Sequence, residues 1–219
     1  MKPSANYFLV LIAFAACKSP VMNKEDSEKT FGPILQFMEY RPGMTFADVG
    51  AGSGAMSVSI AALMDHSTVY IQDIDPKVLK KAEVDKMINI YFRRSGTDLR
   101  TKNKFIVTFG STTKTNLPDG ALDLIYSNAT VHSFTSLDSM VQDLGRKLKP
   151  DGVVYFRDSF KGDHGEGAFC SDKKNCGRPL LTIDEFLAVM KKNGFTLKKQ
   201  SPDMSGYPVF GFTVAQPTP

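Results

Sequence analysis

The sequence predicts an α/β protein with a doubly wound, mostly parallel sheet. Short β-rich segments alternate with segments of helical composition along most of the chain, and a glycine-rich turn joins the first strand to the next helix. The length of 219 residues, 42% of them hydrophobic, suffices for one domain with a sizeable core. We therefore expect a single domain over residues 25–215, followed by a frayed tail at 216–219.

The first predicted unit is a helix followed by a strand, a turn and a second helix. The helix is expected from Glu25 onward because apolar residues recur at i, i+3, i+4 and i+7. These residues are Phe31, Ile34, Leu35 and Met38. Residues 45–49 read as a short apolar strand, and the turn at 50–54 leads into a helix over 55–64.

The same alternation continues toward the C-terminus. A β-rich segment at 68–72 ends at Asp73, after which Asp75 fits an N-cap and Pro76 a first helical residue. Further strands are expected at 104–109, 121–127, 152–157, 194–198 and 209–214, and further helices at 137–148 and 183–192. This order predicts seven strands in a sheet that has helices on both faces.

The charge balance argues against a nucleic-acid-binding protein. The 27 Lys and Arg residues exceed the 23 Asp and Glu residues only slightly, which gives a net charge of +4. Basic residues do not form a stripe interleaved with aromatic ones, as a nucleic-acid interface would require. We therefore expect no nucleic-acid partner.

The N-terminus resembles a bacterial lipoprotein signal. Lys2 precedes an apolar run at 7–16, which is shorter than the about 20 residues of a membrane span but fits a secretory signal. Residues 14–17 resemble a lipobox, with Phe14 in place of the preferred leucine. The resemblance implies a signal peptide at 1–17 with acylated Cys17, a tether at 18–24, and an exported lipoprotein that faces the periplasm and meets the membrane only through its lipid anchor. A plain signal peptide, or an apolar helix of a cytoplasmic protein, is the alternative.

The remaining cysteines, Cys170 and Cys176, lie in a polar loop rich in turn-forming residues. In an oxidising compartment they are a possible disulfide, although sequence alone does not establish the required geometry. Two free thiols, or half of a zinc site completed by Asp163 and His164, are the alternatives. The spacing matches no metal-binding pattern, so we expect no metal site.

The glycines of the turn, Gly50, Gly52 and Gly54, point to a ligand. A strand that turns sharply into a helix while its backbone approaches a ligand leaves no room for side chains. Asp73 follows about 20 residues later at the end of the second strand, where a carboxylate can accept hydrogen bonds from ribose hydroxyls. An ordinary helix-capping role for Asp73, with Asp75 as its competitor, is the alternative. The pattern indicates an adenosine-containing ligand without selecting between NAD and other such cofactors.

Four segments, 41–54, 69–82, 105–132 and 144–158, resemble the motifs of class I S-adenosylmethionine-dependent methyltransferases, in particular the small-molecule group typified by ubiquinone and menaquinone biosynthesis. The resemblance runs from about residue 41 to 194. It implies the Rossmann-like methyltransferase fold with an antiparallel C-terminal strand, S-adenosylmethionine as cofactor and a small-molecule acceptor that remains unidentified. The implied cofactor contacts are Asp48, Gly50, Gly52, Gly54, Asp73, Ile74, Ser111 and Ser127.

Two departures from the family pattern concern the ligands. Ser111 stands where the family commonly has an aspartate that contacts the adenine amino group, and a hydroxyl would bind it more weakly. The segment 128–132 follows the fourth strand, where family members vary with their substrate.

A sulfonium methyl is transferred in line to a nucleophile, so the enzyme must chiefly position the reactants and exclude water. A base is needed only where the acceptor must lose a proton. Candidates are His132 after the fourth strand, Asp158 at the end of the fifth, and His164 in the glycine-rich loop 161–167, which reads as a lid. The alternatives are a hydrogen-bonded helix-start histidine and a surface loop.

Three functional hypotheses follow. The first is an active methyltransferase. The second is an exported binding protein that keeps the fold without catalysis, because S-adenosylmethionine is not expected to be plentiful in the periplasm. The third is an NAD-linked oxidoreductase, which fits the glycines but finds no support beyond Asp73. The oligomeric state is left open, because no dimer seam is visible in the helical segments.

Overall fold

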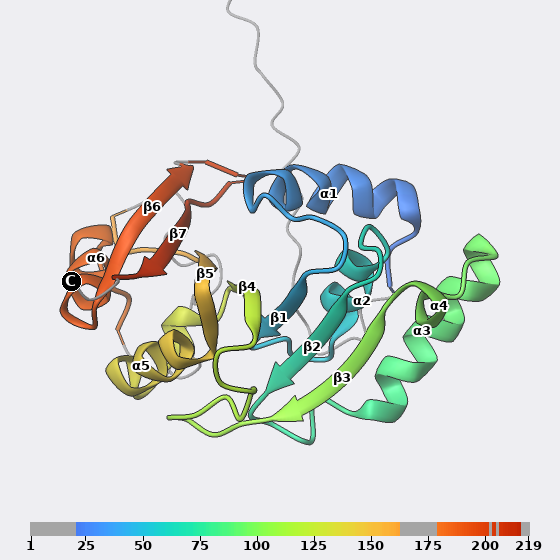
Figure 1. Cartoon of the computed structure of the whole chain (residues 1–219), viewed down its shortest axis with the longest axis horizontal. Helices are drawn as coiled ribbons and strands as arrows, with labels where there is room; N and C mark the ends of the chain where they lie inside the picture. Colours follow the sequence, from blue (N-terminus) through green and yellow to red (C-terminus); the bar gives the residue numbers. More distant parts are fainter. Residues whose placement is uncertain (1–20, 163–178, 202, 205, 216–219) are drawn as a thin grey trace, which may run out of the picture.

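A computed structural model describes residues 21–162, 179–201, 203–204 and 206–215. It contains one seven-stranded sheet in the order β3-β2-β1-β4-β5-β7-β6 (Figure 1). The strands are β1 Thr45–Val49, β2 Thr68–Asp73, β3 Lys104–Phe109, β4 Leu122–Asn128, β5 Leu148–Arg157, β6 Phe195–Ser201 and β7 Val209–Val214. The helices are α1 Lys24–Phe37, α2 Ala55–Ala61, α3 Lys81–Ser95, α4 Leu99–Lys102, α5 Leu137–Lys147 and α6 Ile183–Lys192, with a 3-10 turn, η1, at Val131–Ser133.

The predicted fold class is confirmed. Strands β1 to β5 pair in parallel, and β7 runs antiparallel to both β5 and β6. The order changes direction at β1, because β2 lies on one side of β1 and β4 on the other. In sheets of this kind, ligands bind beyond the carboxyl ends of the strands at that position.

Alternate side chains along each strand pack against different helices. On one face, Phe46 and Ile71 belong to the core cluster that includes α1, α2 and α3. On the other, Val49 and Ile125 belong to the cluster that includes α5 and α6. Both faces are therefore covered around β1 and β4, which holds the strand ends of the central sheet in fixed positions.

The folded part begins before the predicted boundary at residue 25. Val21 is buried, and the Met22 N–H donates to Ser59 Oγ at 3.0 Å. The Asn23 side chain caps α1 by accepting from the Asp26 N–H. Val21 and Met22 thus pack on the domain and α1 begins at Lys24, although we expected a tether over 18–24.

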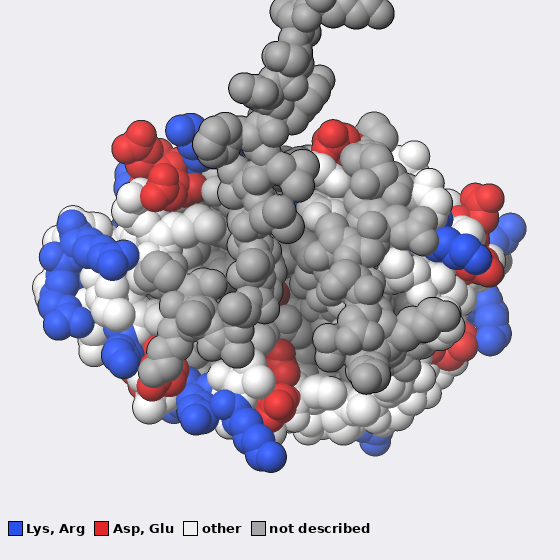
Figure 2. Space-filling view, turned by 180° about the vertical axis from the view of Figure 1, so that it is seen from behind, with Lys and Arg blue, Asp and Glu red and all other residues white. Residues whose placement is uncertain are grey.

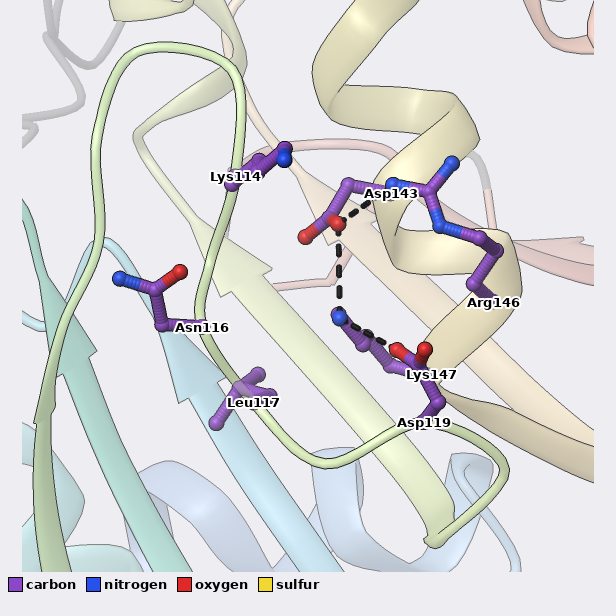
Figure 3. Close-up of a pocket in the computed structure, with 7 residues that line it drawn as sticks. All are labelled: Lys114, Asn116, Leu117, Asp119, Asp143, Arg146 and Lys147. Atoms are coloured by element: carbon purple, nitrogen blue, oxygen red, sulfur yellow. Dashed lines mark hydrogen bonds and ion pairs between the residues drawn. The ribbon is translucent and has the colours of Figure 1, made fainter.

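The connection from β3 to β4, residues 110–121, contains no helix, and one buried carboxylate of α5 holds it in place. Asp143 Oδ2 accepts from both the N–H and the hydroxyl of Thr115 at 2.7 Å. Its Oδ1 accepts from Arg146 at 2.7 Å and lies 3.4 Å from Lys147 Nζ. Figure 3 shows Asp143, Arg146 and Lys147 beside a hollow of about 470 Å³ between α5 and the loop.

Burial disfavours the charged form of Asp143, but the hydrogen bonds from Thr115 and the charges of Lys147 and Arg146 outweigh it and lower the pKa of this carboxyl. Lys147 also donates to the carboxylate of Asp119. The charges of Asp119, Asp143, Arg146 and Lys147 therefore pair with one another, and the arrangement fixes the loop that follows β3.

The margin of the face seen in Figure 2 carries acidic and basic side chains intermixed, in keeping with the small net charge. None of the helices within the described ranges combines the length and the apolarity needed to cross a bilayer.

Candidate functional site

The glycine turn between β1 and α2 has a backbone that L-residues with side chains rarely adopt. Gly50, Gly52 and Gly54 have φ angles of 79°, 56° and 81°. A Cβ on Gly50 would clash with the side chain of Thr130, whereas a Cβ on Gly52 would meet no atom within 4 Å. The turn is therefore packed against the β4–α5 connection at Gly50 and open to space at Gly52.

Hydrogen bonds tie this turn to the end of β2. The N–H groups of Gly50 and Ala51 both donate to the Gln72 carbonyl at 2.9 Å. The Gly52 N–H donates to Asp73 Oδ2 at 2.7 Å. Each predicted glycine and the predicted acid thus belong to one cluster, as the spacing suggested.

The carboxylate of Asp73 also caps the segment that follows it. Its Oδ1 accepts from the N–H groups of Ile74 at 2.7 Å and Asp75 at 3.0 Å. A carboxylate has about four acceptor sites, so these three bonds leave capacity for a ligand hydroxyl. Asp73 is partly exposed and Ile74 is 47% exposed beside it, so both can reach a ligand in this space. The capping role and the ligand-binding role are compatible.

Asp48 lies fully buried beneath the turn. Ser57 of α2 donates to its Oδ2 at 2.6 Å, and its Oδ1 has no hydrogen-bond partner among the described residues. Burial raises the pKa of Asp48 from its usual 3.8 to about 7; the Ser57 hydrogen bond opposes this shift, and the charge of Asp73 adds to it. A buried carboxyl with an unused acceptor is a costly group that a cationic ligand would stabilise.

The remaining predicted cofactor contacts, Ser127 and Ser111, have other surroundings. Ser127 is fully buried on the face of the sheet opposite Asp48, and its hydroxyl has no hydrogen-bond partner in the described chain. Ser111 is exposed, and its hydroxyl accepts from the N–H groups of Thr113 and Lys114 in its own loop. The side chains of Ser111 and Ser127 therefore do not join the Asp48 and Asp73 cluster.

The structure brings two separately predicted candidates into contact. His132 Nδ1 lies 2.8 Å from Asp158 Oδ1, and the His132 N–H donates to Asp158 Oδ2 at 3.2 Å. The Ser159 N–H donates to Oδ1 of the same carboxylate at 2.7 Å. Both side chains are buried. A carboxylate at Nδ1 orients the ring, and in the tautomer that carries its proton on Nδ1, Nε2 is the basic nitrogen.

Sequence reasoning missed the residues that link the turn to this pair. Ala129 has a φ of 54°, a conformation uncommon outside glycine, and it turns the chain after β4. The turn places Thr130 against Gly50, where its hydroxyl donates to the Asn128 carbonyl at 2.9 Å. The only signal in the sequence was the position of 128–132 at the strand edge, since the contact with Gly50 spans 80 residues.

Several predictions fall outside the described residues. Cys17, the Cys170 and Cys176 pair, and His164 with Asp163 all lie in undescribed segments, so their roles stay predictions. Within the described part of the chain, acidic, histidine and cysteine side chains form no cluster of three that could hold a metal ion.

Residues 47–156, just over half of the chain, match the family model of the methyltransferase domain. The chain belongs to the methyltransferase-domain family. The matched span contains the glycine turn, Asp73 and His132, while Asp158 lies just beyond it. Membership supports the predicted class I S-adenosylmethionine-dependent group and implies S-adenosylmethionine as cofactor.

Curated relatives of this methyltransferase-domain chain include two methyltransferases of different kinds. It is 25% identical over 179 residues to the arsenite methyltransferase of Aquipseudomonas alcaligenes, a match that covers 80% of this chain and 51% of the relative. It is 31% identical over 159 residues to the ribosomal protein L11 methyltransferase of Bacillus cytotoxicus, which covers 73% of this chain and 40% of the relative. The chain spans about half or less of the length of these relatives.

Solved structures show the same fold at low identity. A SAM-dependent methyltransferase from Aquifex aeolicus superposes with a TM-score of 0.58 and 18% identity, covering 87% of this chain and 97% of the other. The mitomycin 7-O-methyltransferase MmcR superposes with a TM-score of 0.61 and 17% identity, covering 85% and 54% respectively. These likenesses concern the fold alone.

The residues of the site fit S-adenosylmethionine. Its ammonium and sulfonium groups are cationic, and the site has the partly exposed carboxylate of Asp73 at the turn and the unpaired carboxyl oxygen of Asp48 buried beneath it. The absence of a side chain at Gly52 leaves the space beside them open. The negative charge of these carboxyls and the open space at Gly52 therefore fit the cofactor that the family implies.

The buried charge of Asp48 predicts a gain in stability when it is removed. Because the folded-state pKa is raised from 3.8 to about 7, the contribution of Asp48 to stability is most favourable below pH 3.8 and is lost as the pH rises from there through 7. Asp48→Asn should therefore raise the free energy of unfolding at about pH 8, by at most about 4 kcal/mol at 1.36 kcal/mol per pKa unit. Urea unfolding at several pH values measures this gain, which should disappear toward about pH 4.

Asp151→Asn, which removes an exposed carboxyl, serves as the control and should give no pH-dependent gain. If Asp48→Asn were equally destabilising at every pH, the cost of burying the charge of Asp48 would not govern stability at this site.

Proposed function

We propose that this chain transfers the methyl group of S-adenosylmethionine to a small molecule. The observation that carries the proposal is the pair of carboxylates, Asp48 and Asp73, at a glycine turn that is open at Gly52. When bound there, S-adenosylmethionine supplies an electrophilic methyl group on a positively charged sulfur. The resemblance of the arsenite methyltransferase, by its name an enzyme of a small substrate, supports the acceptor class.

The same turn argues against NAD. In dinucleotide-binding proteins, the glycine-turn N–H groups face an anionic pyrophosphate. Here the Gly52 N–H already donates to Asp73 Oδ2, and a second carboxyl lies buried below at Asp48. A pyrophosphate would be repelled by these carboxylates and would find the Gly52 N–H already bonded, whereas a cationic cofactor would be attracted.

His132 and Asp158 would serve the acceptor rather than the cofactor. Asp158 orients the imidazole through Nδ1, and Nε2 can accept the proton that a hydroxyl, thiol or amine loses as it is methylated. The backbone N–H groups of His132 and Ser159 donate to Oδ2 and Oδ1 of this carboxylate and fix its position. The pair therefore supports an acceptor that must be deprotonated.

We also propose that the domain is exported and anchored through acylated Cys17, on the strength of the lipobox-like segment at 14–17. Val21, the first residue that the structure describes, is buried and lies four residues after this cysteine, so an acyl chain on Cys17 would hold the domain close to the bilayer. An exported binding protein without catalysis remains the alternative function, because the periplasm is not expected to supply much S-adenosylmethionine.

Cofactor binding should depend on Asp73. Calorimetric titration with S-adenosylmethionine, S-adenosylhomocysteine and NAD is expected to show micromolar-range binding of the first two only. Asp73→Asn keeps an acceptor for the turn but removes the charge, and it should weaken binding by about tenfold or more, since a hydrogen bond to a charged group is worth about 1.5–3 kcal/mol.

Asp75→Ala is the matched control, because Asp75 belongs to the same segment but its side chain accepts from the Lys77 N–H instead of the glycine turn. Binding of NAD without binding of S-adenosylmethionine would contradict the proposal.

Methyl transfer should depend on His132 and Asp158, whereas cofactor binding should not. His132→Gln and Asp158→Asn are expected to lower transfer from labelled S-adenosylmethionine to a panel of small phenols, thiols and amines by about 10²-fold or more. The affinity for S-adenosylmethionine should stay within about threefold. His66→Gln, at an exposed histidine before β2, is the control and should leave both quantities unchanged.

If the wild-type chain binds S-adenosylmethionine yet methylates no member of the panel, the binding-protein alternative gains support. Equal losses of affinity and transfer in His132→Gln would instead assign His132 a structural role.

Acylation predicts that cells grown with labelled palmitate incorporate the label into this protein, and that Cys17→Ala abolishes the incorporation. Cys170→Ala controls for the loss of any other thiol. Labelling that persists in Cys17→Ala would exclude the proposed anchor.

A further inference from the structure

The two edges of the sheet differ in their protection against pairing with another strand. At the β6 edge, the register with β7 shifts between Leu197 and Lys199, which marks a bulge. Lys198 and Lys199 also lie on this strand, and both bind Glu39 of the segment after α1. Bulges and lysines are the usual devices that prevent edge-to-edge pairing. The β6 edge is therefore protected.

The β3 edge has no bulge, and its single lysine lies at the first position of the strand. All six residues of β3 pair with β2 in an unbroken register, from Thr68 opposite Lys104 to Asp73 opposite Phe109. The strand contains no proline, and Lys104 at its first position is its only charged residue. A largely apolar edge strand with an unbroken register is a template for pairing.

The hydrogen bonds of β3 show which backbone groups face outward. The N–H groups of Lys104 and Gly110 donate to Ser67 and Asp73 of the β2 side. In a parallel pair the alternate residues, here Phe105 and Val107, direct their N–H and C=O groups away from β2. Neither residue makes a backbone hydrogen bond to any other described segment. An additional strand would satisfy these groups.

Exposed apolar side chains concentrate around the same edge. Six large hydrophobic side chains are exposed among the described residues, and four of them, 42–48% exposed, lie from the end of β2 to β3. They are Ile74, Val78, Phe92 and Phe109. The helix-free connection 110–121 also leaves β2 and β3 without a described helix in front of them in Figure 1. Exposed apolar side chains therefore accompany the unpaired edge.

We propose that β3 pairs antiparallel with β3 of a second copy of this chain, about a two-fold axis at Val107. This register places Phe105 opposite Phe109 of the partner subunit, twice by symmetry, and aromatic pairs across strands are stabilising. It places Lys104 opposite Gly110 of the partner subunit, so no like charges face one another. The composition of β3 is therefore complementary to itself.

The flanking residues supply the area that the strands lack. A stable dimer buries about 1,200–2,000 Å², more than a pair of six-residue strands provides. Phe92 lies near the end of α3, beside the start of β3, whereas Ile74 and Val78 follow the end of β2. The two-fold axis brings these opposite ends together, so that Phe92 of one copy approaches Ile74 and Val78 of the other.

Val107→Pro tests the interface, because it removes an outward N–H and keeps every N–H that donates to β2. Sedimentation and light scattering of the full chain should show a dimer for the wild type and a monomer for Val107→Pro. Both chains carry the same N-terminus, so the difference reports the strand edge. S-adenosylmethionine binding by Val107→Pro should be unchanged, which confirms that the variant folds.

Leu197→Pro on β6 is the matched control. The Ala215 N–H donates to the Gly194 carbonyl, so alternation along the antiparallel pair directs the Leu197 N–H outward. This variant should remain a dimer.

Hydrogen exchange provides a second measurement that needs no variant. The amides of Phe105 and Val107 should become more protected as the protein concentration rises, because they are bonded only in the dimer. A wild-type chain that stays monomeric at about 100 μM, where a dimer of micromolar Kd would form, overturns the proposal. A dimer that persists in Val107→Pro also overturns the proposal. A wild-type dimer in which the amides of Phe105 and Val107 exchange freely does so as well.

Discussion

The hydrogen bond from the Gly52 N–H to Asp73 Oδ2, at 2.7 Å, is the contact on which the geometry of the site depends. It joins the turn after β1 to the end of β2 and complements the two bonds that the Gln72 carbonyl accepts from the same turn. Three backbone N–H groups of the turn are thereby fixed, and the left-handed glycines have one defined path. The open space at Gly52, and the burial of Asp48 beneath, follow from that path.

This arrangement places two carboxylates close together, at a cost to stability. The raised pKa of Asp48 expresses the cost, since burial and the charge of Asp73 both oppose its ionisation. Proteins keep such groups mainly where a ligand offsets the unfavourable interaction. A cationic cofactor does so by charge, and the unused oxygen of Asp48 shows that the described part of the protein itself does not.

Much of the fold could be predicted because its signals are local. Glycines at 50, 52 and 54 mark the turn, and the alternation of apolar strands and helices gives the parallel sheet. Short or irregular elements were missed. Helix α4 has four residues, too few for a periodic pattern. Strand β5 begins at Leu148, earlier than the predicted residue 152, because the sequence from Pro150 to Gly152 is typical of a turn. The contact of Thr130 with Gly50 depends on chain segments far apart and on the unusual φ of Ala129, so it had no signal.

The contact between His132 and Asp158 could not be predicted from their positions in the sequence alone, because it depends on the register between β4 and β5. His132 and Asp158 were each expected at the carboxyl edge, but an edge several strands wide does not specify contacts. The parallel register sets Asn128 opposite Arg157, so Asp158 lies one residue beyond β5 while the chain after β4 turns at Ala129 toward it. That same turn packs Thr130 against Gly50. The β4–α5 connection therefore links the acids of β1 and β2 to the imidazole, and it holds the proposed cofactor and proton-accepting groups in one rigid frame.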